Sequence, residues 1–219
     1  MLRSCAFATT AFVMTGFASA DYYTDEASDI FDGGLTNLDI IGAEITNDDL
    51  DLVVSIDFLD LNADWGKYVM LIDRVGFDDQ NSMNPWGRDI STPSGIDAFM
   101  GSWIDGDGGG GVSRMNGFGE WIGTGGASPM VDWDGDRITY RMALADLGLE
   151  LGDTFNFDIG TTGGGDNDPA IDLLSTNVMQ PGWGGGSSSP MAYSYTVIPA
   201  PGAFSLVLGC GLRSRRRRD

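Results

Sequence analysis

Leu52-Val53-Val54-Ser55-Ile56-Asp57-Phe58 is the stretch that decides the fold. Every second side chain from Val54 to Phe58 is apolar, whereas Ser55 and Asp57 between them are polar. This alternation predicts a β-strand with one buried face. The same alternation recurs at residues 138–142, 154–159 and 193–197. Because such strands need a second layer to cover their apolar faces, the pattern predicts a β-sandwich.

The remaining segments also favour an all-β class. Tyr68-Val69-Met70-Leu71-Ile72 is a continuous apolar run, which predicts a central strand covered on both faces. Only Ala143 to Gly148 has a helical pattern, a single turn that ends on glycine. Further strand candidates are residues 41–45 and 99–103, and expected turns are residues 47–49, 105–111, 163–165 and 184–186. We therefore expect an antiparallel β-sandwich with jelly-roll or immunoglobulin-like layering and one short helical turn.

The N-terminal residues 1–20 differ in composition from the middle of the chain. They hold one charge, Arg3, then an apolar stretch and the small residues Ala18-Ser19-Ala20. This is the pattern of a secretory signal peptide that export machinery uses and that is cleaved after Ala20. The alternatives are a membrane anchor or a buried N-terminal helix, but the apolar stretch is shorter than the about 20 residues that span a bilayer. We expect residues 21–198 to form a single β-sandwich domain.

The C-terminal residues 199–219 combine three features in order. A proline motif at Pro199, Ala200 and Pro201 precedes a short apolar stretch, residues 203–212, and then a cluster of five arginines. This order resembles a PEP-CTERM sorting tail. The resemblance implies an exosortase-type processing enzyme as partner, transient membrane contact through the tail, and a final place at the cell surface or in the extracellular matrix, in the outer envelope of a bacterium.

The tail also departs from that family. Ala200 stands where the family has glutamate. The apolar stretch of ten residues would reach ~15 Å as a helix, about half of a ~30 Å hydrocarbon core. The alternative interpretation is a basic terminus without a sorting role.

The charge and the missing residue types exclude several functions. Residues 21–198 hold six basic and 31 acidic residues, so nucleic acid and anionic lipid would be repelled. Because the chain has no histidine, a Ser-His-Asp triad and a histidine zinc site are excluded. The only cysteine after residue 20 is Cys210, which leaves residues 21–198 without a disulfide. A glycosidase needs only two carboxylates, but no motif selects a pair, and we expect no catalytic residues.

The middle of the chain resembles exported β-sandwich domains related to family-nine carbohydrate-binding modules and DOMON-type domains. The shared pattern is Leu71-Ile72-Asp73, then Leu147-Gly148, then Gly152-Asp153. This resemblance implies a sandwich and is compatible with sugar binding. Tryptophan faces stack on the apolar faces of sugars, and loops concentrate binding residues. The carbohydrate-binding candidates are Trp86, Trp121 and Trp183, which lie in Gly- and Pro-rich loops, and Arg88. The alternative is that these tryptophans only pack.

Clusters of aspartate supply the oxygen ligands that calcium prefers. Asp132, Asp134 and Asp136 lie within five residues, although their spacing is not that of an EF-hand. Asp166 and Asp168, with Asp172 nearby, form a second cluster, and Asp105 with Asp107 a third. Because aspartate also favours turns, a purely structural role is the alternative.

These observations favour an exported, surface- or matrix-sorted, non-catalytic sandwich that binds carbohydrate. One alternative is a structural or adhesive surface protein whose aspartate loops are stabilised by calcium, with no other cofactor required. A second alternative is an extracellular glycan hydrolase that uses a carboxylate pair.

Overall fold

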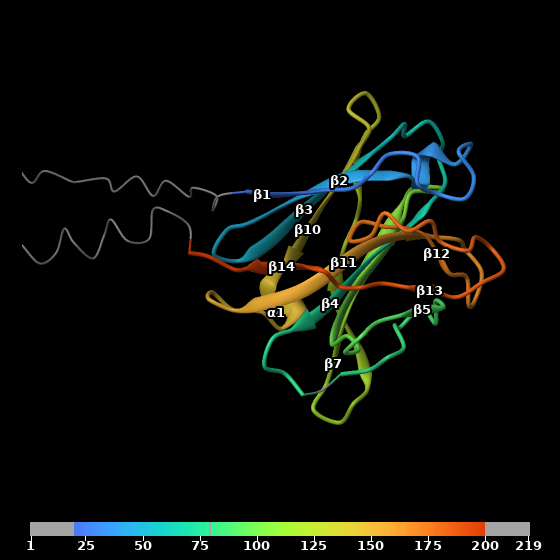
Figure 1. Cartoon of the computed structure of the whole chain (residues 1–219). Coiled ribbons are helices and arrows are strands. Elements are labelled where there is room, and N and C mark those ends of the chain that lie inside the picture. The colour runs from blue at the N-terminus through green and yellow to red at the C-terminus, as the bar shows by residue number, and fades with distance from the viewer. Residues whose placement is uncertain (1–19, 79, 200–219) are drawn as a thin grey trace, which may run out of the picture.

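The computed structural model describes residues 20–78 and 80–199, which form two antiparallel sheets packed face to face (Figure 1). The first sheet has the strand order β1 (Asp21–Thr24), β2 (Ile40–Asn47), β3 (Asp51–Phe58), β10 (Arg137–Ala143), β9 (Met130–Asp132). The second has the order β12 (Ala170–Leu173), β11 (Thr154–Thr162), β4 (Lys67–Arg74), β6 (Ala98–Trp103), β7 (Gly109–Met115), β8 (Trp121–Gly126), and β14 (Tyr193–Thr196) also pairs with β11. The prediction of an all-β antiparallel sandwich is confirmed.

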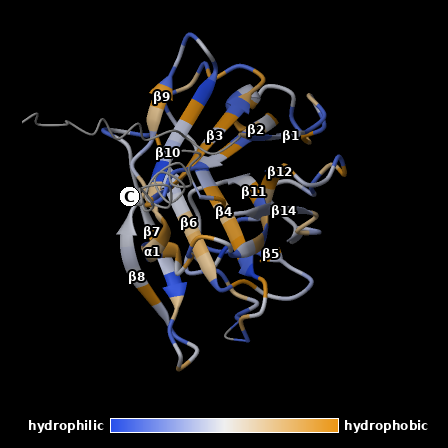
Figure 2. Cartoon of the chain, turned by 90° about the vertical axis from the view of Figure 1, so that its left-hand side faces the viewer, coloured by the Kyte–Doolittle hydropathy of each residue, from blue (hydrophilic) through white to orange (hydrophobic). Residues whose placement is uncertain are grey.

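Apolar alternation located the strands well. Each of the four alternating segments lies in a strand, and hydrophobic positions are interleaved with hydrophilic ones along the first sheet (Figure 2). The apolar run of β4 lies between β11 and β6 and is buried on both faces, as expected. The predicted helical turn is α1 (Leu144–Leu147), and Gly148 follows it with a φ of 71°, a left-handed value that favours glycine. A second short helical element is the 3-10 turn η1 (Thr36–Leu38).

One turn prediction was partly wrong. Residues 105–111 were expected to form a turn, but β7 begins at Gly109. Two of the three glycines at its start are closely approached, Gly109 by the indole of Trp103 and Gly110 by the backbone carbonyl of Ala127, which a turn pattern does not reveal.

The main core lies between the two sheets. Side chains from one face of each central strand form this core, for example Val54 and Ile56 of β3, and Phe155 and Phe157 of β11. Each of these side chains is fully buried, and burial of a large apolar side chain stabilises the fold by about 1.5–3 kcal/mol.

The outer face of the second sheet has its own apolar cluster, which explains why β4 is apolar on both sides. The residues 80–97, including β5 (Ile90–Ser91), cover this cluster together with residues near β13 (Ser187–Ser188), and β5 and β13 pair in parallel. We call residues 80–97 the covering segment. The buried carboxylate of Asp73 anchors it by accepting hydrogen bonds from Gln80 Nε2 (2.6 Å) and Ser94 Oγ (2.8 Å).

The described chain begins and ends at the same end of the sandwich (Figure 1). Asp21, the residue after the exposed Ala20, pairs with Ile45, and the backbone N–H of Ile198 donates to Oδ1 of Asn47 (3.1 Å). Pro199 is half-buried, whereas the predicted signal peptide before Ala20, the sorting residues Ala200 and Pro201, and the rest of the tail lie outside the described residues. Within the described part of the chain, no helix is long and apolar enough to cross a membrane.

Candidate functional site

A pair of tryptophans lies on the outer face of the second sheet. Trp103 ends β6 and is 37% exposed, while Trp86 reaches the same face from the covering segment. Their ring centroids are 6.3 Å apart and their planes are inclined by 40°. Trp86 also packs edge-on against the buried ring of Phe99, at 5.7 Å between centroids, which fixes its position on the sheet. We call Trp86 and Trp103 the aromatic pair.

Glycines beneath the aromatic pair make room for it. A side chain at Gly101 would collide with the indole of Trp86, and one at Gly109 would collide with the indole of Trp103. The glycine strip continues through Gly111, which pairs with Gly101, to Gly126 on the edge strand β8. A Cβ atom at Gly126 would meet nothing within 4 Å, so the surface is open on that side.

Arg88 lies beside the aromatic pair. Its guanidinium carbon is 5.5 Å from the ring centroid of Trp86, and its Nη1 donates to the carbonyl oxygen of Gly165. The side chain of Asn84 fixes this loop, because its Oδ1 accepts from the backbone N–H of Arg88 (3.0 Å) and its Nδ2 donates to the Arg88 carbonyl (2.9 Å). Burial lowers the pKa of Arg88, and the carboxylate of Asp168 acts against that shift. Among the described residues, Nε of Arg88 is buried without a hydrogen-bond partner.

The other two predicted tryptophans have different surroundings. The loop prediction for Trp121 was wrong, because this residue begins the glycine-rich strand β8. Trp121 is half-buried, and its Nε1 donates to the carbonyl of Met83 in the covering segment (2.9 Å). Trp183 is 47% exposed and packs edge-on against Phe31, at 5.7 Å between centroids. The structure therefore joins Trp86 to Arg88 and adds Trp103, which sequence reasoning did not select. The available signal was the same-face spacing of Phe99, Gly101 and Trp103 in a predicted strand.

The aspartate loops serve as turns. Asp132 accepts from the backbone N–H of Gly135 (3.2 Å) and Asp136 from that of Leu61 (2.8 Å), while Asp134 is exposed. In the other loop, Asp168 accepts from the backbone N–H of Gly165 (2.7 Å), and Asp166 is exposed. Calcium binding at these loops remains a prediction.

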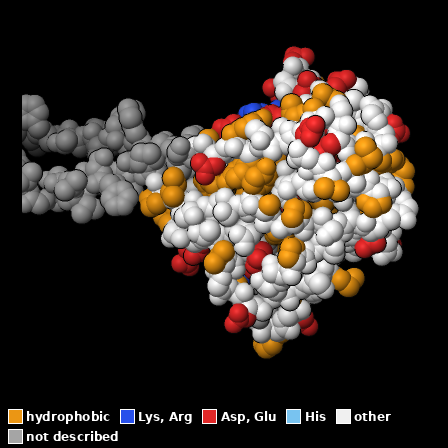
Figure 3. Space-filling view, in the orientation of Figure 1, with side chains coloured by type: hydrophobic (Ala, Val, Ile, Leu, Met, Phe, Trp, Pro, Cys, Tyr) orange, Lys and Arg blue, Asp and Glu red, His pale blue; other side chains and the backbone are white. Residues whose placement is uncertain are grey.

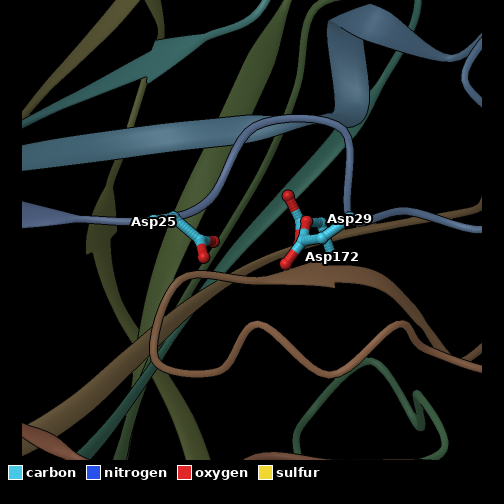
Figure 4. Close-up of side chains that lie close together, drawn as sticks. All are labelled: Asp25, Asp29 and Asp172. Carbon is cyan, nitrogen blue, oxygen red and sulfur yellow. The ribbon is translucent and has the colours of Figure 1, made fainter.

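Three other carboxylates converge at the edge of the sandwich (Figure 4). Asp25 follows β1, Asp29 lies four residues later, and Asp172 belongs to β12; one oxygen from each lies within 4.8 Å of the other two. Asp172 is 3% exposed, and its oxygens accept from the backbone N–H groups of Ile40 (2.6 Å) and Leu173 (2.8 Å). We call Asp25, Asp29 and Asp172 the carboxylate trio. Sequence reasoning noted Asp172 but missed the other two.

Burial and like charge disturb the titration of the carboxylate trio. Burial, followed by the charge of Asp172, raises the pKa of Asp25 to about 9. Burial also raises the pKa of Asp172 to about 8, and it raises that of Asp29 together with the nearby charge of Asp39. Each shift shows that negative charge is costly at this position unless a cation or a proton compensates it.

Comparisons of the chain with protein-family models, with curated proteins and with solved structures give no match.

Proposed function

We propose that the protein is an exported, surface-displayed, non-catalytic β-sandwich that binds carbohydrate on the outer face of its second sheet. The observation that carries this proposal is the aromatic pair. Two partly exposed indoles inclined by 40° offer apolar faces on which sugar rings stack, and glycines hold them close to the sheet. Arg88 adds a hydrogen-bond donor for sugar hydroxyls beside Trp86. A mostly apolar surface with a few fixed polar groups is typical of small-ligand sites.

The surroundings favour an uncharged polysaccharide. The open glycine strip from Gly111 to Gly126 leaves room for a polymer to continue beyond the aromatic pair. Residues 21–198 are strongly acidic, and the face shown in Figure 3 carries scattered acidic side chains and one small basic group. An acidic polysaccharide would therefore be repelled at low salt.

The positions of the chain ends fit surface display. The described C-terminal end lies near the Arg74 end of β4, because Thr196 pairs with Thr154, whose carbonyl accepts from the backbone N–H of Val75. The described N-terminal end lies at the same end of the sandwich (Figure 1). Trp103 pairs with Lys67 at the opposite end of β4, seven residues away or ~23 Å. A body held through its C-terminal end by an exosortase-type sorting system, in a bacterial envelope, would present the aromatic pair outward.

The carboxylate trio does not offer the accessible carboxylate pair that a glycan hydrolase would need. Oxygen Oδ2 of Asp25 and both oxygens of Asp29 are buried, so a substrate does not reach them. The aromatic pair and the trio also belong to different parts of the sandwich, β6 with the covering segment and β12 with the N-terminal segment.

Affinity electrophoresis of the purified protein in gels with uncharged polysaccharides tests the proposal. We expect retardation by at least one polysaccharide, and about tenfold weaker binding by Trp86→Ala and by Trp103→Ala, equivalent to ~1.4 kcal/mol. Trp133→Ala is the matched control, because Trp133 is 48% exposed on the first sheet's side of the molecule, in the turn between β9 and β10. Absence of binding to the whole panel, or an equal loss in Trp133→Ala, would refute the proposal.

A further inference from the structure

We propose that Asp25, Asp29 and Asp172 together bind one calcium ion, which fastens the N-terminal segment of the mature chain to the second sheet. The proposal concerns a different surface from the carbohydrate proposal and does not depend on it. It rests on the geometry of the carboxylate trio and on oxygens of the trio that are buried without a partner.

The first observation is convergence. The N-terminal segment supplies Asp25 and Asp29, and strand β12 supplies Asp172, so residues about 145 positions apart meet within 4.8 Å. The three side chains point toward a common region in Figure 4. Three carboxylates hold up to six oxygens, and calcium takes six to eight oxygen ligands, with water completing the set.

The second observation is that these oxygens lack hydrogen-bond donors. Both carboxylate oxygens of Asp29 and Oδ2 of Asp25 each expose less than 1 Å² and, within the described chain, accept no hydrogen bond. The backbone N–H of Asp29 lies near its own carboxylate but outside hydrogen-bond geometry. A buried carboxylate without a donor is costly, and a cation removes that cost. By contrast, Asp39 nearby accepts from the backbone N–H of Ser28 with both oxygens, at 3.1 and 3.0 Å.

The third observation is the lack of a basic side chain at the trio. Among residues 20–78 and 80–199, the ion pairs of Lys67, Arg74, Arg137 and Arg141 all go to other acids. Arg88 donates to Gly165, and Nη1 of Arg114 lies beside Gly148, after α1. The nearby groups that act on Asp25 are further carboxylates, Asp158 among them. The chain thus concentrates negative charge here, and an external cation is the remaining source of compensation besides protons.

A bound calcium ion would connect the two sheets at their open edge. Asp25 and Asp29 lie between β1 of the first sheet and η1, whereas Asp172 lies on β12 of the second sheet. The other contacts of this edge include hydrogen bonds from Tyr193 Oη to the Thr24 carbonyl (2.8 Å) and from Tyr23 Oη to the Ser194 carbonyl (2.8 Å). The ring of Tyr23 also packs edge-on against that of Phe157, at 5.0 Å between centroids. Calcium is therefore expected to control how firmly the N-terminal segment is held.

Calorimetric titration of the chelator-treated protein with calcium chloride at pH 7 tests the proposal. We expect one site per chain and a melting temperature that rises with calcium, by about 5–10 °C at one hundred times the dissociation constant. Asp29→Asn keeps the shape of the side chain and removes one ligand charge, so we expect at least tenfold weaker calcium binding. Asp134→Asn is the control, because it removes the same charge from an exposed turn, and we expect less than a twofold change.

The sign of the stability change separates a calcium site from a merely structural cluster. Without calcium, Asp29→Asn removes a carboxyl group whose charged form is costly to bury, so the variant is expected to melt above the wild type. With calcium, it is expected to melt below the wild type, because it lacks one ligand charge. Asp25→Asn should show the same two changes in melting temperature, and it replaces Asp29→Asn in the test if that variant does not fold. The proposal would be overturned if the titration showed no heat of calcium binding and calcium left the melting temperature unchanged. It would also be overturned if Asp134→Asn lost as much calcium affinity as Asp29→Asn.

Discussion

The buried ion pair between Arg74 and Asp97 is expected to dominate the stability of the covering segment. Oδ1 of Asp97 accepts from Nε of Arg74, and its Oδ2 accepts from the Arg74 backbone N–H (2.9 Å). Nη1 of Arg74 donates to the carbonyl of Gly148 (3.0 Å) after α1. The side chains are 6% and 0% exposed, so neither charge reaches water. The pair joins the end of the covering segment to β4 and to α1.

Asp97→Asn removes the negative charge and leaves the Arg74 guanidinium buried without a counter-charge. Loss of one partner of a buried pair costs about 3–5 kcal/mol. At about 2–4 °C per kcal/mol for a domain of this size, the melting temperature should fall by roughly 6–20 °C. The combination of Arg74→Met with Asp97→Asn removes both charges and keeps an amide oxygen for the Arg74 backbone N–H. Because no unpaired charge remains, this double variant should be more stable than Asp97→Asn alone.

Urea denaturation at pH 7 and constant calcium, followed by circular dichroism, gives the free energy of unfolding of all three proteins. Asp51→Asn is the comparison, since it breaks an ion pair with Arg141, whose side chain is 44% exposed, and should cost less than about 1 kcal/mol. Equal losses in Asp97→Asn and Asp51→Asn, or simple additivity in the double variant, would refute the reasoning.

Three further predictions concern pH, the aromatic pair and the covering segment. Burial raises the pKa of Asp158 to about 6 from 3.8, so its protonated form stabilises the fold below pH 4 and that stability is lost as the pH rises through 6. Urea titrations should show wild type losing about 2–2.5 kcal/mol more than Asp158→Asn between pH 4 and pH 7. Gly101→Val should expel the Trp86 indole, giving a red shift of tryptophan fluorescence and loss of polysaccharide binding; an unshifted spectrum would contradict the packing described. Asp73→Ala should release the covering segment, so limited proteolysis should cut within residues 80–97 sooner than in the wild type, and an unchanged digestion pattern would be evidence against this anchor.

Sequence alone predicted the strands whose two faces differ in polarity. The strands β3, β10, β11 and β14 alternate, and β4 is apolar from Tyr68 to Ile72, so the sequence itself indicates which of their faces are buried. The edge and glycine-rich strands were not predictable in this way. β8 is Trp-Ile-Gly-Thr-Gly-Gly, and β7 begins with three glycines, so glycine interrupts the β-branched and alternating pattern on which a strand prediction depends.

The candidate sites were only partly accessible from the sequence. Loop composition selected Trp86, because residues in Gly- and Pro-rich loops are more often exposed. Arg88 was selected through the resemblance to carbohydrate-binding sandwich domains. Trp103 was not selected because its position depends on Gly109, which has no side chain and lies opposite it on the paired strand. That pairing is set by the strand register, which the sequence does not reveal. Asp25 was not predicted for a similar reason: its partner Asp172 is distant in the chain, so no local sequence spacing indicates that the two carboxylates lie close together.

The most direct test of the account is a ¹⁵N spectrum of the indole N–H groups during titration with the polysaccharide that binds best. The six tryptophans give separate indole signals, which single substitutions assign. The account predicts that the signals of Trp86 and Trp103 shift together with saturation, while that of Trp133 stays in place. Shifts confined to Trp133 or Trp183, with Trp86 and Trp103 unmoved by a bound polysaccharide, would contradict it.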